Sequence, residues 1–494
     1  MKKITGTFLG IDLGTSAVKI VLMDGEQNIL AQSSAPLTVS QPQPLWSEQN
    51  PAHWWEATCS AIQQLQATHI KELSQVQAIG LSGQQHGATL LNAKNEVLRP
   101  AMLWNDGRSF AECAILAEAE PDYQKITGNL IMPGFTAPKL LWVARHEPNI
   151  FHEIAKVLLP KDYLRWKMTG AFVSDMSDAS GTAWLDVGHR CWSDSLLLAT
   201  GLTQRHMPDL CEGCDISATL TPEVAKLWKV PAGTPVVGGA GDNAATAISL
   251  DVIKPGSAFL SLGTSGVYFV ANQNFLPNPP SAVHTFCHCL PHLWHQMSVH
   301  LSAASCLDWL ADLLSTDIDT LLLEAEQAAA SHETVLFLPY LSGERTPHNN
   351  PHAKGTFFGL TSHTKRADMT RAVLEGVAFA FADGQEAIIK AGTHIEEVSV
   401  VGGGAKSLFW GEILASVLNR PLTYRSNREA SAAFGAARLA WLSITKADAF
   451  GAFIPPLAET VVWPQPAHVK RYTAKRQLFQ TLYQQLKTLF EDSV

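Results

Sequence analysis

The chain has 494 residues, of which 46% are hydrophobic and 16% are charged. This composition is typical of a globular protein with substantial cores, and the length exceeds what one domain usually holds. The net charge of −9 and the lack of a basic run argue against nucleic acid or an anionic membrane surface as the main partner. No stretch of 18 apolar residues occurs, and Asp12 interrupts the first apolar stretch before a signal-peptide core forms. We therefore expect a cytoplasmic protein whose eight cysteines are free thiols.

The first predicted element is a hairpin formed by strands at residues 8–11 and 18–23. Its turn carries Gly14, Thr15 and Ser16, which offer backbone N–H groups and hydroxyls to a phosphate. The neighbouring Asp12 could hold a hydrated magnesium ion, because Mg²⁺ is usually bound by one or two carboxylates and keeps several waters. An ordinary polar turn explains the same residues equally well.

Two polar clusters in the first half of the chain each follow a short apolar segment. A predicted strand at residues 76–81 ends in Ser-Gly-Gln-Gln-His-Gly, which includes Gln85 and His86, and such side chains suit hydrogen bonding to a polyol. His86 alone would more often be a structural histidine. Asp106, which follows Trp104, could accept two sugar hydroxyls, or it could form an Asp-Gly turn with a surface salt bridge to Arg108.

The central stretch at residues 235–245 reads as a buried strand, three glycines, Asp242 and a helix of small residues. Glycine lets the backbone approach a ligand, so a carboxylate at this strand end is expected to face a cleft. The alternative is that Asp242 only caps the following helix.

A four-residue repeat divides the chain. Leu-Gly-Thr-Ser occurs at residues 13–16 and again at 262–265, each time next to a strand pattern. The repeat predicts two similar domains, each presenting a phosphate-binding hairpin to a shared cleft. Asp12 of the first copy is replaced by Ser261 in the second, so only the first hairpin supplies an acid, and Asp242 lies between the copies near the expected hinge.

The second half contains a polar loop at residues 342–347, whose charges could simply pair with each other, and a helix from residue 368 to about 391. A strand at 398–401 then meets Gly402, Gly403 and Gly404 before a helix at about 407–418. Three glycines in that position permit close approach of a nucleotide, although neither the dinucleotide-binding nor the P-loop spacing is present. Residues 471–489 read as an amphipathic helix.

Two longer segments resemble the signatures of the FGGY carbohydrate kinases. They are residues 134–146, beginning Gly-Phe-Thr-Ala-Pro-Lys, and residues 355–375, beginning Gly-Thr-Phe-Phe-Gly-Leu and ending Thr-Arg-Ala-Val-Leu-Glu. Within that family, residues 47–49, 134–139, 175–179 and 342–351 are most similar to the bacterial xylulose kinases. The resemblance implies an α/β, two-domain actin-like ATPase (ribonuclease H-like) fold with an interdomain cleft. It divides the chain into a sugar-binding and catalytic domain at 1–246 and a nucleotide-binding domain at 247–494.

The resemblance also implies roles for individual residues. Asp242 matches the catalytic base, which also contacts the sugar, and Asp12 matches the acid that supports Mg²⁺ through water. Gln85, His86 and Asp106 match sugar contacts. Together with the phosphate-binding turn, the nucleotide contacts are expected at Thr15, Ser16, Gly263, Thr264, Gly403 and Gly404. The implied reaction is transfer of the ATP γ-phosphoryl to a primary hydroxyl of a ketopentose, giving xylulose 5-phosphate, and a homodimer is a family expectation.

One difference from the resembling kinases leaves the identity of the sugar substrate open. The resembling kinases carry Met where this chain has Gln85, and an amide adds a donor and an acceptor to the pocket. A kinase for ribulose, gluconate, glycerol or another sugar therefore remains an alternative. An actin-like nucleotide switch without kinase activity is the alternative from another functional class.

Overall fold

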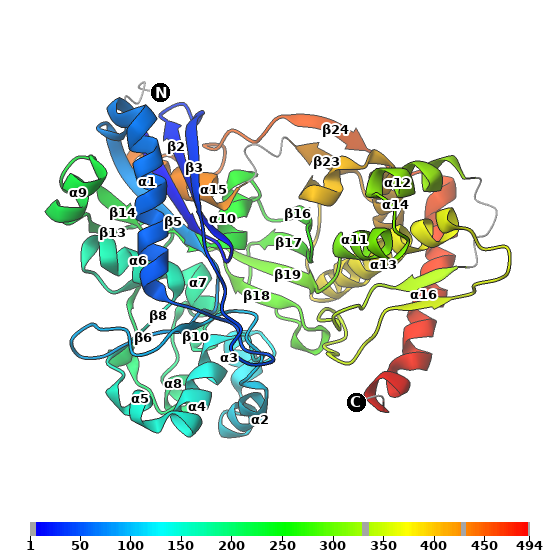
Figure 1. Cartoon of the computed structure of the whole chain (residues 1–494), viewed down its shortest axis with the longest axis horizontal. Coiled ribbons are helices and arrows are strands. Elements are labelled where there is room, and N and C mark those ends of the chain that lie inside the picture. Colours follow the sequence, from blue (N-terminus) through cyan, green and yellow to red (C-terminus); the bar gives the residue numbers. More distant parts are fainter. Residues whose placement is uncertain (1–5, 329–334, 426–430, 493–494) are drawn as a thin grey trace.

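The structure is a computed structural model that describes residues 6–328, 335–425 and 431–492. Its elements form two lobes, each built on a seven-stranded sheet (Figure 1). The first sheet has the order β13 (Ile216–Thr219), β14 (Pro235–Val237), β5 (Val76–Gly83), β1 (Thr7–Leu13), β2 (Ala17–Asp24), β3 (Ile29–Pro36), with β15 (Ala240–Gly241) also pairing β5. The second has the order β18 (His284–Cys287), β19 (Trp294–His300), β17 (Gly266–Asn272), β16 (Ser257–Leu262), β22 (Glu397–Val401), β23 (Leu422–Arg425), β24 (Ala458–Val462).

Alternation along β1 places apolar side chains on both faces of the first sheet, because successive side chains of a strand point to opposite sides. Leu9 and Ile11 belong to a core that they share with α1 (Pro51–Leu73). Phe8 belongs to a different core on the opposite face, which it shares with α15 (Ala432–Thr445). Helix α1 begins after Asn50, which is the N-cap and whose side chain accepts from the Ala52 N–H at 3.0 Å.

Helix α15 comes from the second half of the sequence but packs on the first sheet and on α10 (Asp242–Ser249) (Figure 1). Glycines permit this approach. A Cβ on Gly80 would lie 1.8 Å from the Ala436 carbonyl oxygen, and a Cβ on Gly435 would lie 1.8 Å from that of Ala245. The small residues of α15 therefore allow it to pack closely on the first sheet and on α10. The proposed domain division at 246/247 falls inside α10 and stays a prediction.

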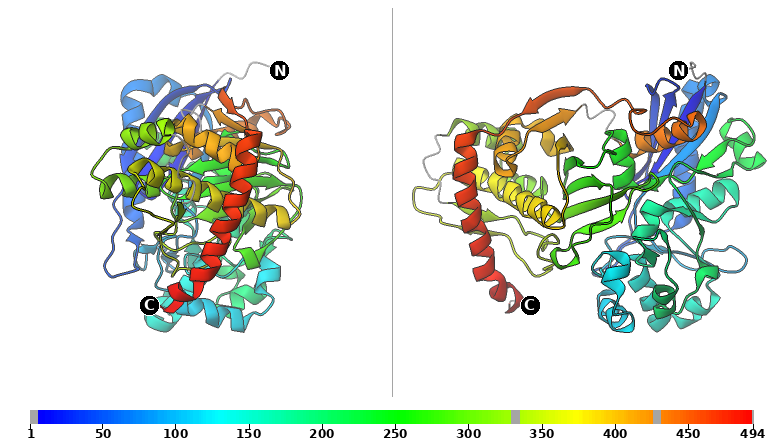
Figure 2. Two further views of the ribbon diagram at one scale, coloured as in Figure 1. Left: turned by 90° about the vertical axis from the view of Figure 1, so that its right-hand side faces the viewer. Right: turned by 180° about the vertical axis from the view of Figure 1, so that it is seen from behind.

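The second lobe has helices on one face of its sheet, and its other face meets the first lobe. Phe259, Phe269 and Phe286 from that second face share a core with Ala247 and Leu250. The helices of this lobe are α11 (Ser305–Leu313), α12 (Ile318–Gln327), α13 (Arg366–Lys390), α14 (Leu408–Leu418) and α16 (Pro466–Asp492). In Figure 2, α16 runs along the side of this lobe remote from the first sheet.

Edge strand β18 is also bonded to the first lobe. Asn129 Nδ2 donates to the Thr285 carbonyl at 2.9 Å, and Asn129 Oδ1 accepts from the Thr285 N–H at 2.9 Å. Ser180 Oγ accepts from the Cys287 N–H at 3.0 Å. These hydrogen bonds fix β18 of the second lobe against the first lobe.

The remaining elements complete the lobes. In the first lobe the helices are α2 (Phe110–Ala119), α3 (Tyr123–Thr127), α4 (Thr136–His146), α5 (Pro148–Glu153), α6 (Pro160–Thr169), α7 (Met176–Ser180), α8 (Asp194–Ala199) and α9 (Pro222–Trp228). Two-stranded pairs are β4 (Glu48–Gln49) with β7 (Ala101–Met102), β6 (Thr89–Leu91) with β8 (Lys156–Leu158), β9 (Val173–Asp175) with β12 (Asp209–Cys211), β10 (Leu185–Asp186) with β11 (Cys191–Trp192), and β20 (Leu336–Leu338) with β21 (Thr356–Phe358). Three-residue or four-residue 3₁₀ turns lie at 204–206, 279–281 and 403–406.

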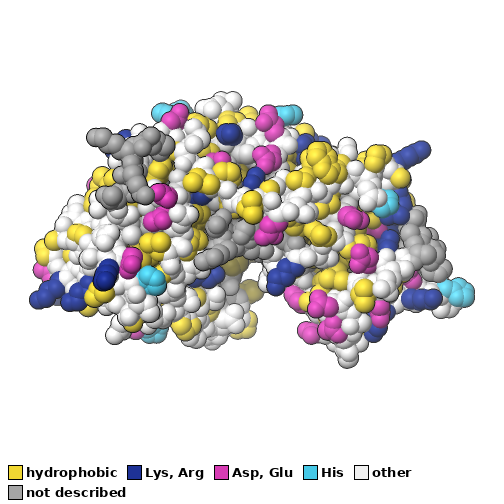
Figure 3. Space-filling model, turned by 90° about the horizontal axis from the view of Figure 1, so that it is seen from above, with side chains coloured by type: hydrophobic (Ala, Val, Ile, Leu, Met, Phe, Trp, Pro, Cys, Tyr) yellow, Lys and Arg dark blue, Asp and Glu magenta, His cyan; other side chains and the backbone are white. Residues whose placement is uncertain are grey.

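The surface carries both signs of charge. On the face shown in Figure 3, acidic and basic side chains are interspersed among apolar and neutral ones over both lobes. Across residues 6–328, 335–425 and 431–492, we find no helix whose length and apolar content would suit a membrane span.

Candidate active site

Two carboxylates lie on either side of strand β5. Asp12 on β1 is in register with Ser82 of β5, and Ser82 Oγ donates to Asp12 Oδ1 at 3.0 Å. On the other side of β5, Ala240 of β15 is in register with the same Ser82. Because these strands run parallel, Asp12 and Asp242 emerge at the same edge of the sheet, where ligand sites of parallel sheets form. Burial raises the pKa of Asp12, and the Ser82 hydrogen bond and Lys19 lower it in part.

Asp242 is the first residue of α10, and Gly241 occupies the N-cap position. Its Oδ1 accepts from the Asn243 N–H at 2.7 Å and from Asn243 Nδ2 at 2.9 Å. Its Oδ2 makes no hydrogen bond with the described residues. Burial, followed by the negative charge of Asp12, raises the pKa of Asp242 to about 7. A carboxylate with this pKa and a free oxygen can accept a proton near neutral pH.

A buried polar network holds the segment that carries Asp242. Ser177 Oγ accepts from the Gly241 N–H at 3.1 Å and donates to Asp175 Oδ2 at 2.5 Å. Asp175 Oδ1 lies 2.8 Å from Lys161 Nζ, and both side chains are fully buried. Arg165 adds a second anchor, because its guanidinium donates to the carbonyls of Val237, at 2.6 Å, and Gly238.

Gln85 packs directly against this segment. A Cβ on Gly241 would lie 2.5 Å from Gln85 Nε2, so a larger residue there would displace the amide from its present position. Gln85 Nε2 donates to the Ser177 carbonyl at 3.3 Å, and Oε1 makes no hydrogen bond within the described part of the chain. The amide oxygen is thus available to accept from a ligand hydroxyl.

His86 is held as a neutral imidazole. Its pKa is lowered to about 3, first by burial and then by the positive charges of Lys139 and Arg345. Nδ1 lies 2.6 Å from the Gly181 carbonyl, which can only accept, so Nδ1 carries the proton and Nε2 keeps a lone pair. The His86 carbonyl accepts from Lys139 Nζ at 2.9 Å. Burial lowers the pKa of Lys139 to about 7.

Asp106 is already well supplied with protein donors. Its Oδ2 accepts from the Ser47 N–H at 2.7 Å and from Arg108 Nη2 at 2.6 Å, and its Oδ1 accepts from Arg108 Nε at 2.9 Å. The salt bridge that the sequence suggested therefore exists, but it is buried and not on the surface. Few lone pairs remain for sugar hydroxyls, so the sugar-binding role of Asp106 stays a prediction.

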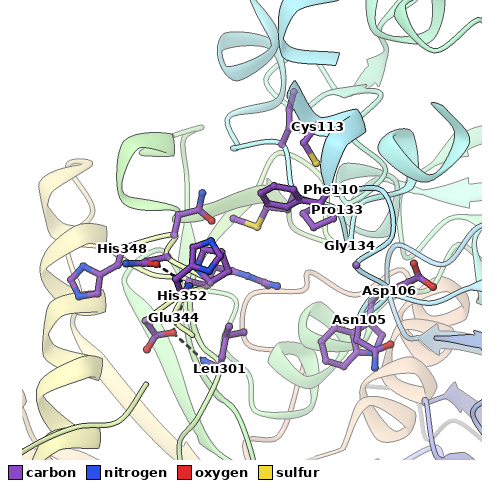
Figure 4. A pocket seen from close by; sticks show the side chains of 18 of the residues that line it. Asn105, Asp106, Phe110, Cys113, Pro133, Gly134, Leu301, Glu344, His348 and His352 are labelled. Carbon is purple, nitrogen blue, oxygen red and sulfur yellow. Dashed lines mark hydrogen bonds between the residues drawn. The ribbon is translucent and has the colours of Figure 1, made fainter. Parts of the chain in front are cut away.

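A cavity of about 570 Å³ lies between the lobes (Figure 4). Of the residues predicted from the sequence, Asp106 lines it, whereas Asp12, Gln85, His86 and Asp242 do not. Asn105, Asp106 and Phe110 line it from the first lobe, and Glu344 and His348 line it from the second. In Figure 4 these two groups lie on opposite sides of the opening.

Trp104 also lines this cavity. In the sequence pattern it is only the apolar residue that precedes the polar cluster of Asp106. It is 39% exposed, and its Nε1 donates to Thr15 Oγ1 at 3.0 Å. A partly exposed aromatic ring in a cavity that also has charged lining residues suits packing against the carbon face of a sugar. The exposure of Trp104 depends on the fold, and the sequence carries no signal for it.

The expected nucleotide residues fall into two groups. Gly263, Thr264, Gly403 and Gly404 line one cavity of about 530 Å³ in the second lobe, with an apolar wall that includes Leu307 and Leu322. Gly402 has φ +101°, and a Cβ there would lie 2.6 Å from the Leu262 carbonyl oxygen, so the turn requires glycine. This cavity presents backbone and an apolar surface together, as a nucleotide base and phosphates need.

Thr15 and Ser16 do not line that cavity. Thr15 Oγ1 donates to Gln84 Oε1 at 3.1 Å and accepts from Trp104, and Ser16 is exposed. The first hairpin therefore sits with Asp12 on the side of Gln84 and Trp104, and the phosphate-binding role of Thr15 and Ser16 stays a prediction.

Comparison with known proteins assigns the family. Residues 7–249 match the N-terminal domain of the FGGY family of carbohydrate kinases, and residues 258–444 match its C-terminal domain. The chain belongs to this family. It is 52% identical to the xylulose kinase of Escherichia coli (strain K12) over 484 residues, covering 98% of this chain and 99% of that protein.

Solved structures agree with the FGGY assignment. The crystal structure of a xyloylose kinase from Brucella ovis has a TM-score of 0.95 and 49% identity, and the match covers 98% of this chain and all of that one. The xylulose kinase of Rhodospirillum rubrum has a TM-score of 0.91 and 29% identity with the same coverage. The predicted α/β two-domain fold of the family is confirmed, and this FGGY chain is a carbohydrate kinase.

Proposed function

We propose that the chain transfers the γ-phosphoryl group of ATP to a primary hydroxyl of D-xylulose, giving D-xylulose 5-phosphate and ADP. The observation that carries the proposal is the end-to-end likeness to proteins named as xylulose kinases, at 52% identity in one case. The free Oδ2 of Asp242, at the edge of the sheet that holds Gln85 and His86, supports the reaction type.

In this mechanism Asp242 orients the sugar hydroxyl and takes its proton. Kinase transition states are loose, so the protein contributes mainly alignment and charge stabilisation. Gln85 Oε1 and the lone pair of His86 Nε2 accept from sugar hydroxyls. The second-lobe cavity at Gly263 and Gly403 binds the nucleotide.

Magnesium is part of the proposal. Asp12 and Asp242 are two neighbouring half-buried acids, and the repulsion that raises the pKa of Asp242 would be relieved by a cation. Asp12 would hold Mg²⁺ through water, as suits an ion that keeps several of its waters. When bound, the ion would neutralise charge on the β- and γ-phosphates of ATP.

Asp242→Ala tests the assignment. We expect loss of ADP release in a coupled assay, while D-xylulose binding by calorimetry changes little. Asp251→Asn, an acid just beyond the end of α10, is the matched control and should retain turnover. Appreciable turnover by Asp242→Ala would reject Asp242 as the base.

A sugar panel tests the substrate. D-xylulose, D-ribulose, D-gluconate and glycerol are compared at equal enzyme concentration by kcat/KM. We expect D-xylulose to be preferred, and a clear preference for D-ribulose would overturn the choice of sugar while leaving the kinase activity in place.

A further inference from the structure

A rigid loop of the second lobe places Arg345 in the interlobe cavity. Glu344 and Asn350 exchange two backbone hydrogen bonds, at 2.9 and 2.8 Å. Thr346 Oγ1 donates to the Ala282 carbonyl at 2.9 Å and accepts from the Val299 N–H at 3.0 Å. The backbone on both sides of Arg345 is therefore fixed against the edge of the second sheet.

The guanidinium of Arg345 has no carboxylate within 4.0 Å among the described residues. Its neighbour Glu344 is engaged elsewhere, since Glu344 Oε1 accepts from the backbone N–H groups of Leu301, at 3.1 Å, and of Arg345 itself, at 2.7 Å. Glu344 Oε2 lies 3.3 Å from His300 Nδ1. The two charges of the loop do not form the ion pair that the sequence allowed.

The surroundings of this cation are unusual for a structural arginine. Burial lowers its pKa, with only the charge of Glu344 acting in the opposite direction. Arg345 is half-buried, and a charge that is taken partly out of water is costly to leave without a partner. The hydrogen bond that the structure gives to this guanidinium joins Nη1 to His284 Nε2 at 3.3 Å.

His284 links Arg345 to His86 through buried aromatic rings. The His284 ring lies 5.6 Å from the Phe135 ring, which lies 4.8 Å from the His86 ring. The positive charge of Arg345 contributes, after burial, to the lowered pKa of both His284 and His86. His284 and Phe135 are buried, so Arg345 and His86 are linked through an aromatic core. Arg345 lines the interlobe cavity opposite Trp104 and Asp106 of the first lobe.

We infer that Arg345 is a sugar-binding residue contributed by the second lobe, whose guanidinium donates to the oxygen atoms of a sugar held in the cavity that Trp104 and Asp106 also line. A guanidinium only donates, and a ketone oxygen only accepts, so the hydroxyketone end of a ketose matches it chemically. The contact spans the two lobes, so sugar binding favours their closure. This inference rests on the proposed sugar kinase function.

The test uses the wild-type enzyme's best sugar and the variants Arg345→Gln and Arg345→Lys. Hydrogen bonds to a charged group contribute about 1.5–3 kcal/mol, so Arg345→Gln should raise the KM for the sugar about 10- to 150-fold. The KM for ATP should stay within about twofold, because the nucleotide cavity has other lining residues. Arg345→Lys, which keeps the charge but loses the planar fork, should be intermediate.

Lys487→Gln is the matched control, because this exposed lysine lines the same cavity and loses the same charge. It should leave the sugar KM unchanged. Thermal denaturation checks that each variant is folded, and should Arg345→Gln fold poorly, the sugar KM of Arg345→Lys decides in its place.

Two results would overturn the inference. One is an unchanged sugar KM in the folded Arg345 variants, and the other is a fall in kcat or a rise in the ATP KM with the sugar KM unchanged. Failure of the proposed function looks different, because the wild type would then turn over none of the sugars. In that case, calorimetric binding of D-xylulose to wild type and Arg345→Gln without nucleotide still measures the contact.

Discussion

Asp12 and Asp242 lie on opposite sides of strand β5, and the negative charge of Asp12 raises the pKa of Asp242. Burial makes the larger contribution, and together they bring the pKa of Asp242 to about 7. A general base works best when its pKa is near the working pH, since it is then both ionised and basic enough. The placement of two acids at one sheet edge thus tunes the proposed base.

The first prediction concerns the pH dependence of activity. With nucleotide and magnesium bound, kcat/KM for the sugar should fall about tenfold per pH unit below the pKa of Asp242, because protonated Asp242 cannot accept the hydroxyl proton. That pKa should lie above the ordinary 3.8, because burial raises it, and below about 7, because the cation offsets the repulsion from Asp12. The measurement is initial rate at low sugar concentration from pH 5 to 9 with saturating nucleotide and magnesium. An acid limb near pH 4 would mean that Asp242 titrates as an ordinary carboxyl group or is not the base.

The same pKa shift predicts a pH-dependent stability change. An acid whose pKa is 3.8 when unfolded and about 7 when folded binds more protons in the folded state between those values. Ionised Asp242 therefore destabilises the fold increasingly as pH rises from 3.8 to 7, and fully above 7. Asp242→Asn should raise the Tm at pH 8 and have a much smaller effect at pH 4. Asp312→Asn, an exposed acid on α11, should change the Tm little at either pH, and equal shifts for the two variants would contradict the prediction.

Local patterns predicted the elements around the site. The repeated Leu-Gly-Thr-Ser marked the two hairpins, β1–β2 and β16–β17, and the glycine run after β14 placed Asp242 at the start of a helix. These features follow from residues close together in the chain, where strand periodicity and glycine turns act directly.

Contacts between distant segments were beyond such patterns. Three hydrogen bonds join residues that are far apart in the sequence. The Ser47 N–H donates to Asp106 over a separation of 59 residues, Trp104 donates to Thr15 over 89, and Arg345 contacts His284 over 61. The return of α15 to the first sheet is set by packing of the whole molecule. Hydrogen bonds between distant residues decide which polar groups stay free to bind a ligand. Neighbouring residues in the sequence do not indicate which distant residue will supply the partner.

The third prediction concerns Ser177 as a positioning residue. Its hydroxyl joins the Gly241 N–H to the buried Asp175–Lys161 pair, so Ser177→Ala should let the Asp242 segment shift. We expect kcat to fall about 10- to 100-fold with the KM for ATP unchanged, because small misplacements of a reacting group are costly. Ser177→Thr, which keeps the hydroxyl, should restore much of the rate.

The control for this prediction lies on the adjacent strand. Ser174 of β9 is also buried, but its Oγ has no hydrogen-bond partner in the described structure, so Ser174→Ala removes a hydroxyl without breaking a link. Its kcat should match the wild type. If Ser174→Ala and Ser177→Ala lose activity equally, the effect of Ser177 is general destabilisation.

The last prediction concerns Gln85 and sugar preference. D-xylulose and D-ribulose differ only in configuration at C3, so an enzyme separates them by where its acceptors and donors lie. Gln85 offers a free Oε1 beside Gly241, and Met at this position would offer only a weak acceptor. A neutral hydrogen bond contributes about 0.5–1.5 kcal/mol, so Gln85→Met should reduce the xylulose-to-ribulose ratio of kcat/KM about 2- to 10-fold. Gln85→Glu, which keeps the acceptor, should retain more of the discrimination than Gln85→Met. The ratios come from parallel coupled assays, and an unchanged ratio in both variants would show that Gln85 does not read the C3 hydroxyl.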